Sequence, residues 1–204
     1  MSSFRLGSRG RPGFSAWKLG DSIQVCSILA HIGSNITLYV DDPYADGHKL
    51  IQHLSDSVYT DKYKLEFKRG NHPTVLYPDQ FYLENNVDVV SYTFNKRVTG
   101  YVTTQKYSRS ASRSIGDIST FVGDRESFDL SQAHTRGTTI KQLFETVGNA
   151  QEHIGAASGI SWVAMSTNTP CTILLNREHR RNYRQWDYAL EAMYRNSNVR
   201  IYDV

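Results

Sequence analysis

The fold class of the chain is decided by residues 18–42, which read KLGDSIQVCSILAHIGSNITLYVDD. In the first half of this stretch the apolar residues recur at the spacing of one helix face, and Gly33 follows where helices commonly end. Residues 36–40 are β-branched and apolar, as in a strand that a parallel sheet buries on both faces. A second helix is predicted over residues 45–54. Helix, strand, acidic turn and helix in this order indicate an α/β fold.

Strands and helices continue to alternate along the rest of the chain. Short strands are predicted at residues 65–67, 74–77, 87–92, 100–104, 118–122 and 170–176, with a further strand that begins at residue 152. Helices are predicted at residues 139–147, from residue 160, and at residues 183–194. We therefore expect a flexible N-terminus at 1–15, followed by two mostly parallel α/β halves at 16–97 and 98–204.

The charge of the chain is modest but unevenly distributed. The 204 residues suffice for a core without disulfides or metal. The formal net charge of +3 is milder than the excess typical of proteins dedicated to nucleic acid. The clustering of basic residues favours ligands that carry phosphate, with a solvated basic face as the alternative for each cluster alone. The clusters are Arg5, Arg9 and Arg11; Lys106, Arg109 and Arg113; and Arg177, Arg180, Arg181 and Arg184.

Cysteine usage and the N-terminus indicate a compartment. Cys26 and Cys171 each lie within an apolar stretch, which suits two buried thiols in a reducing environment better than a disulfide framework. Apolar runs stay short of the roughly 18 residues that would span a membrane. Residues 1–13 lack the apolar core of a secretory signal. A cytoplasmic protein is therefore the expectation.

Gly20 and Asp21 stand at the predicted start of the first long helix. Glycine lets another molecule approach the backbone, and the N–H groups of a helix start favour an anion. Asp21 has two interpretations. It caps the helix and complements the helix dipole, which the local sequence favours slightly, or it is a general base that takes a proton from an attacking hydroxyl.

A second loop of small residues reads GAASGISW at positions 155–162 and falls at a predicted turn from strand to helix. Backbone donors with no side chain in front of them suit a diphosphate. Tight packing of the strand against the helix explains the small residues equally well, so both interpretations stay open.

Cations and aromatic rings mix in the segment after the last predicted strand, where α/β proteins bind ligands. Such a mixture suits a sugar, a nucleobase or a nucleic-acid strand, and an ordinary charged helix start is the equally weighted alternative. The candidate acceptor or nucleic-acid contacts are Arg177, Arg180, Arg181, Tyr183, Arg184 and Trp186.

The sequence offers no motif for metal or hydrolase chemistry. The seven histidines show no spacing typical of metal ligands, and Asp41-Asp42 lacks the spacing of an Asp-x-Asp pair. Ala157-Ser158-Gly159 is not a nucleophile elbow. We therefore expect neither a metal nor a resident cofactor.

Three segments, taken in order, resemble bacterial lipopolysaccharide heptosyltransferases. Residues 18–23 are similar to the Gly-Asp loop that opens those enzymes. Residues 103–106 (Thr103-Thr104-Gln105-Lys106) are similar to the strand-end loop of their donor-binding half, and residues 143–175 to their donor-side signature. The resemblance implies a compact, shortened GT-B-like arrangement, in which an active-site cleft lies between two Rossmann-like halves.

The resemblance also implies a reaction and the residues for it. The reaction is an inverting, metal-independent transfer of a sugar from a nucleotide-sugar co-substrate to a hydroxyl of a saccharide. The three basic clusters and the small size of the chain also permit a hydroxylated base in DNA as the acceptor. Asp21 is the implied general base. The implied donor-binding residues are Lys106, Ser158, Gly159 and Ser161. Gly20, in the loop at the helix start, and Arg109, in the basic cluster, are further donor-binding candidates.

Two departures from the family pattern keep other functions open. Ala157 stands where the family more often has Asp or Asn, and Trp162 stands where His is commoner. These departures and the short chain are also compatible with a non-catalytic nucleotide- or nucleotide-sugar-binding protein. A third alternative is a helper subunit whose partner completes the cleft.

Overall fold

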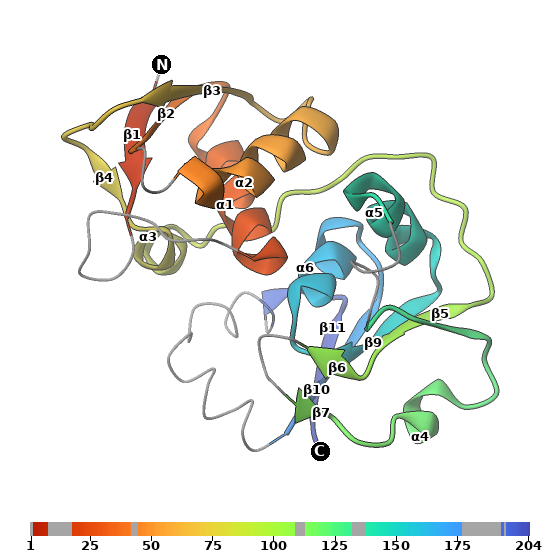
Figure 1. Ribbon diagram of the computed structural model, residues 1–204. Helices are drawn as coiled ribbons and strands as arrows, with labels where there is room; N and C mark the ends of the chain where they lie inside the picture. Colours follow the sequence, from red (N-terminus) through yellow and green to blue (C-terminus); the bar gives the residue numbers. More distant parts are fainter. Residues whose placement is uncertain are drawn as a thin grey trace. The chain divides into compact units, whose positions relative to one another are not determined.

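The computed structural model describes residues 2–7, 18–41, 45–108, 113–131, 138–176, 193 and 195–204. The chain divides into two compact units, Met1–Val90 (unit 1) and Ser91–Val204 (unit 2). Each unit is built on a parallel sheet accompanied by helices (Figure 1). The expected α/β fold with two Rossmann-like halves and mostly parallel sheets is confirmed.

Unit 1 alternates strands and helices along the chain. Its elements are β1 (Ser2–Leu6), α1 (Leu19–Ile32), β2 (Asn35–Val40), α2 (Ala45–Ser57), β3 (Lys64–Arg69), β4 (Val75–Leu76) and α3 (Pro78–Asn85). Within the described residues the strands form a four-stranded sheet in the order β3-β2-β1-β4, and every neighbouring pair is parallel. α1 and α2 pack against each other beside this sheet (Figure 1).

The N-terminus, expected to be flexible over residues 1–15, instead supplies a central strand of unit 1. β1 pairs with β2 on one side and with β4 on the other, and Phe4 and Leu6 are buried. Sequence patterns do not detect this strand because it is short and merges into an Arg- and Gly-rich stretch. Its pairing partners lie far along the chain, so the sheet determines it. Residues 8–15 lie outside the described residues.

α1 ends where the sequence predicts. Gly33 has a φ of 121°, which favours glycine, and its N–H donates to the Leu29 carbonyl oxygen at 3.2 Å. The predicted burial of both thiols is also confirmed, because Cys26 in α1 and Cys171 in unit 2 are free and buried.

Unit 2 contains a second parallel sheet and a small ribbon. Its elements are β5 (Val102–Gln105), β6 (Tyr107–Ser108), β7 (Arg113–Ser114), α4 (Ser119–Val122), β8 (Ser127–Asp129), α5 (Ile140–Asn149), β9 (Glu152–Ala156), α6 (Gly159–Ser166), β10 (Cys171–Leu175) and β11 (Val199–Asp203). In the described part of the unit, the sheet order is β11-β10-β9-β5-β8, all parallel, and β6 pairs with β7 antiparallel.

Local sequence explains the main elements of unit 2. Thr139 and Gln142 form a capping box at the start of α5: the Thr139 N–H donates to Gln142 Oε1 at 2.9 Å, and the Gln142 N–H to Thr139 Oγ1 at 3.2 Å. β10 is buried at every residue, as expected for a strand covered on both faces. α5 and α6 pack against each other (Figure 1). Phe121 and Val122 of α4 pack on a cluster that includes Val102, Ile115, Ile118, Ile154 and Leu174.

Two predicted strands are wrong. Residues 87–92 run outside both sheets: the Val90 N–H donates to Ser27 Oγ at 2.9 Å, and the boundary between the units follows Val90 rather than residue 97. Residues 119–122, predicted within a strand, form the single helical turn of α4. Neither stretch pairs with a strand of the described sheets. The predicted helix at 183–194 falls almost wholly outside the described residues.

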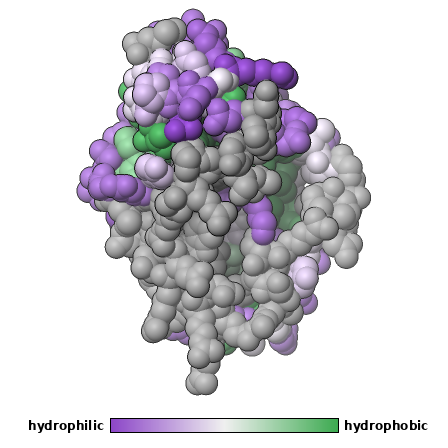
Figure 2. Space-filling view, turned by 60° about the vertical axis from the view of Figure 1, so that its left-hand side comes forward, coloured by the Kyte–Doolittle hydropathy of each residue, from purple (hydrophilic) through white to green (hydrophobic). Residues whose placement is uncertain are grey.

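Among the described residues, few large apolar side chains are exposed. On the face drawn in Figure 2 the described residues are mostly hydrophilic, and apolar residues show only in limited areas. None of the described helices is long and apolar enough to cross a membrane.

Candidate functional site

The carboxyl ends of β5 and β9 meet in the middle of the unit 2 sheet. β5 and β9 are neighbours in this sheet. The next strand of the sheet after β5 along the chain is β8, which lies on one side of the pair, and the next after β9 is β10, which lies on the other. The connections that leave β5 and β9 therefore run in opposite directions. Ligands of open α/β sheets bind in the crevice that such a divergence leaves at the carboxyl ends. We therefore define the β5–β9 site as Gln105 and Lys106 together with the turn at residues 156–159.

The two strands approach closely at this edge because residue 155 is glycine. Gln105 and Gly155 are directly paired. A Cβ atom on Gly155 would lie 2.7 Å from the backbone oxygen of Gln105 and 3.0 Å from its backbone nitrogen. A side chain at position 155 would push the strands apart. Tight packing therefore explains this glycine of the small-residue loop.

Ser158 connects the ends of the two strands. It is the N-cap of α6: its Oγ accepts the Ile160 N–H at 3.1 Å and its hydroxyl donates to Oε1 of Gln105. Ser158 is 6% exposed and Gln105 is 9% exposed, so this pair is buried at the start of α6. The helix dipole adds partial positive charge at the same place.

The other two predicted residues of the loop differ in what they offer. Gly159 is the first residue of α6, and an N–H at that position has no acceptor within the helix. The hydroxyl of Ser161 donates to the Ala156 carbonyl oxygen at 3.1 Å, and its side chain is fully buried. Gly159 therefore offers a backbone donor to a ligand, whereas the Ser161 hydroxyl is engaged inside the protein.

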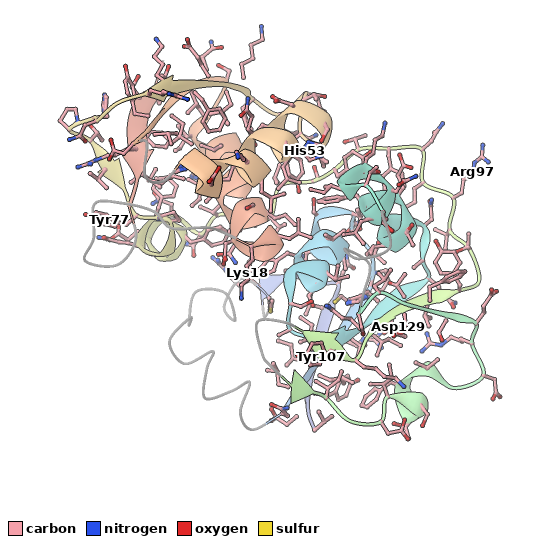
Figure 3. The ribbon with its side chains drawn as sticks, in the orientation of Figure 1. Lys18, His53, Tyr77, Arg97, Tyr107 and Asp129 are labelled. Atoms are coloured by element: carbon pink, nitrogen blue, oxygen red, sulfur yellow. The ribbon has the colours of Figure 1, made fainter. Side chains whose placement is uncertain are left out.

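Lys106 has an exposed side chain, and its backbone is bonded to the turn that follows β8. The backbone N–H groups of Lys106 and Tyr107 donate to Ser131 Oγ at 3.2 and 3.3 Å. The Ser131 hydroxyl donates to Asp129 Oδ1 at 2.6 Å. Tyr107 and Asp129 are labelled in Figure 3. Sequence reasoning missed this chain of hydrogen bonds because its members lie far apart along the chain and form no motif.

An acidic residue lies near Lys106. Hydrogen bonds from the backbone and side chain of Ser119, together with the charge of Lys106, hold the pKa of Asp117 below its ordinary value. Lys106 therefore has an ionised carboxylate for a neighbour at neutral pH, and an anionic ligand would compete with that carboxylate for the ammonium group.

Gly20 and Asp21 lie in the first turn of α1 in unit 1, next to Lys18 (Figure 3). The Lys18 N–H donates to Asp21 Oδ2 at 3.3 Å, so Asp21 caps the helix. Burial raises the pKa of Asp21, and this effect outweighs the opposing hydrogen bond and charge of Lys18. A carboxylate with a raised pKa is a stronger base, so the capping geometry and the proposed proton acceptance are compatible.

Two buried polar side chains follow Asp21 on the same helix. Ser22 is fully buried and Gln24 nearly so, and within the described residues neither Ser22 Oγ nor Gln24 Oε1 has a hydrogen-bond partner. Such atoms are rare in folded proteins and call for an explanation, such as a ligand or a water. Sequence reasoning missed them because a Ser and a Gln inside a helix form no recognisable motif.

No family model, curated protein or solved structure matches the chain.

The remaining predicted residues are not placed. Arg109 lies outside the described residues, as do the candidate acceptor contacts Arg177, Arg180, Arg181, Tyr183, Arg184 and Trp186. In the part of the chain that the structure describes, there is no group of three or more His, Cys, Asp or Glu side chains that could hold a metal ion.

Proposed function

We propose that the chain is a glycosyltransferase that moves a sugar from a nucleotide-sugar donor to a hydroxyl acceptor, with the donor diphosphate at the β5–β9 site. One observation carries this proposal. The sequence predicts two donor-binding segments, residues 103–106 and 155–162. In unit 2 they meet at the carboxyl ends of β5 and β9, where the Ser158 hydroxyl donates to Gln105.

The chemistry of sugar transfer suits what this site offers. A leaving diphosphate accumulates negative charge, which oriented donors and cations stabilise. The start of α6 supplies the Gly159 N–H and the helix dipole, and Lys106 supplies a cation. The proposed transfer is inverting and metal-independent, and Asp21, whose pKa is raised by burial, is its general base.

The first test is thermal unfolding of the full chain with nucleoside diphosphates and nucleotide-sugars. A ligand that binds the folded chain adds about 2.7 kcal/mol of stability at a hundredfold excess over its Kd, which is measurable as a rise in Tm. We expect a rise with one nucleoside diphosphate and with its sugar derivative. If no member of the panel raises the Tm, the proposed donor site is wrong.

Replacing the proposed base tests catalysis separately from binding. Asp21→Asn keeps an oxygen that can accept the Lys18 N–H but loses the ability to take a proton. We expect transfer to fall by about 10²- to 10⁴-fold, the usual contribution of general base catalysis, with unchanged donor affinity. Asp46→Asn, an exposed aspartate in the first turn of α2, is the matched control. Full activity of Asp21→Asn would remove Asp21 from this role.

The acceptor is proposed to be a saccharide or a hydroxylated base in DNA. Binding to DNA through phosphate contacts weakens steeply as salt rises, because bound counterions are released. Titration with duplex DNA at two salt concentrations therefore separates the two classes. A steep salt dependence supports the DNA acceptor, and the lack of any DNA binding leaves the saccharide.

A non-catalytic nucleotide-binding protein is the second candidate. The observation that favours it is that Asp21 and the hydroxyls of Ser158 and Ser161 all have structural partners in the protein. On this hypothesis the chain binds a nucleotide-sugar and never consumes it, whatever acceptor is offered. Assays of donor consumption across a wide acceptor panel distinguish the two.

A further inference from the structure

One donor group at the β5–β9 site has no hydrogen-bond partner among the residues that the structure describes. The Gln105 side chain is 9% exposed, and its Oε1 accepts the hydroxyl proton of Ser158. Its Nε2 atom has no hydrogen-bond partner among the described residues, yet it is not among the buried polar atoms that are sealed from solvent. A mostly buried amide thus keeps an unused NH2 group in contact with the site.

The bond to Ser158 determines how this amide is turned. The Ser158 hydroxyl gives its single proton to Gln105 Oε1 and accepts the Ile160 N–H, so both of its functions are engaged. With Oε1 bonded to the Ser158 hydroxyl, the part of the Gln105 amide without a partner is its NH2 group, which presents two N–H donors. Its partner Ser158 is the N-cap of α6 and directly precedes Gly159, the first residue of that helix.

We propose that Gln105 is a ligand-binding residue whose Nε2 donates to a non-bridging phosphate oxygen, together with the N–H of Gly159. Ser158 is the positioning residue that orients the amide. An ionised phosphate only accepts hydrogen bonds, so it matches a group that only donates. The identification of this phosphate as part of a nucleotide-sugar diphosphate rests on the proposed function.

The test replaces the N–H donors of the Gln105 side chain by a hydrogen-bond acceptor. Gln105→Glu keeps an oxygen for the Ser158 hydroxyl but puts a negatively charged oxygen in place of the NH2 group. We expect the Kd for inorganic pyrophosphate, and for the best of UDP, ADP, GDP and CDP, to rise by about tenfold or more in calorimetric titrations of the full chain, equivalent to about 1.4 kcal/mol. The matched control is Gln151→Glu, the same charge change at an exposed position before β9, at the opposite end of the strand. Its Kd should stay within about twofold of native.

A second variant keeps the inference testable if Gln105→Glu does not fold. Gln105→Met removes the donors without adding charge, and it too should weaken pyrophosphate binding, although by less. Melting curves identify the variants that fold. Native affinity for pyrophosphate in a folded Gln105 variant overturns the inference.

The result separates this inference from the proposed function. If pyrophosphate binds and its affinity depends on Gln105 while no nucleotide binds, the anion site stands and the nucleotide-sugar donor fails. If nucleotides bind with an affinity independent of Gln105, the donor site stands and the role of Gln105 fails. If native protein binds neither, both are wrong.

Discussion

Single residues decide how closely the two strands of the β5–β9 site approach. Gly155 leaves room for the Gln105 backbone, which a Cβ atom would meet at 2.7 Å. Unit 1 shows a similar contact, because a Cβ on Gly7, directly after β1, would lie 2.7 Å from the ring of Tyr77. In each sheet a glycine thus allows a close contact at the carboxyl end of a strand.

Gly155→Ala should destabilise unit 2. The added methyl group meets backbone rather than a flexible side chain, so the strands must separate, and overpacking of this kind typically costs about 1–3 kcal/mol. The same shift should disturb the pairing of Gln105 with Ser158 and weaken diphosphate binding. Denaturant unfolding and calorimetric titration measure the two effects.

The control for this prediction is Gly100→Ala in the same unit. A Cβ atom on Gly100 has nothing within 4 Å, and its φ is outside the left-handed region. We expect little or no loss of stability there. A Gly155→Ala protein as stable as Gly100→Ala would contradict the packing role assigned to Gly155.

At the scale of elements, the end of β8 supports the loop after β5. Asp129 accepts the Ser131 hydroxyl, and Ser131 Oγ accepts the backbone N–H groups of Lys106 and Tyr107. The loop that carries the proposed cation therefore depends on a turn from a neighbouring strand. The backbone at Lys106 is thus held by hydrogen bonds, while its exposed side chain lies near the Asp117 carboxylate, with which an anionic ligand would compete.

Ser131→Ala should loosen this loop without unfolding the unit. It removes the acceptor for two backbone N–H groups, and the net loss of hydrogen bonds of this kind is about 0.5–1.5 kcal/mol each. We expect faster hydrogen exchange at Lys106 and Tyr107 and a higher Kd for pyrophosphate. Ser127→Ala, an exposed serine at the other end of β8, is the control. Unchanged exchange at Lys106 in Ser131→Ala would show that the turn does not order the loop.

At the scale of the whole molecule, a buried histidine links the stability of unit 2 to pH. His153 on β9 is fully buried, with Nδ1 3.2 Å from Thr103 Oγ1 and with no partner for Nε2 within the described residues. Burial lowers the pKa of His153 to about 4. The unfolded chain has the ordinary value of about 6.5, so it binds a proton that the folded chain rejects.

Acid should therefore destabilise unit 2. The contribution of His153 is complete above about pH 6.5 and is lost as the pH falls from there to about 4, by roughly 3 kcal/mol in total. Denaturant unfolding at several pH values measures this slope. His153→Gln should flatten it, and His53→Gln, at an exposed position of α2, should leave it unchanged. An identical slope in native protein and His153→Gln would contradict the prediction.

Local patterns in the sequence determined the α/β class, the helices α1 and α5, the buried strands β2 and β10, and the two loops of the candidate site. These features depend on apolar periodicity, capping residues and glycines, which act over a few neighbouring residues. The resemblance placed Lys106 and the Ser158–Gly159 turn on the donor side, and the site geometry is compatible with that expectation.

Tertiary structure alone decided the rest. The place of β1 at the centre of its sheet and the strand order β11-β10-β9-β5-β8 arise from pairing between distant segments, which no local pattern encodes. Gln105 and Ser158 are 53 positions apart, and the amide becomes a directed donor only because β5 and β9 are neighbours. The side-chain chemistry was visible in the sequence, but its convergence at one edge required the fold.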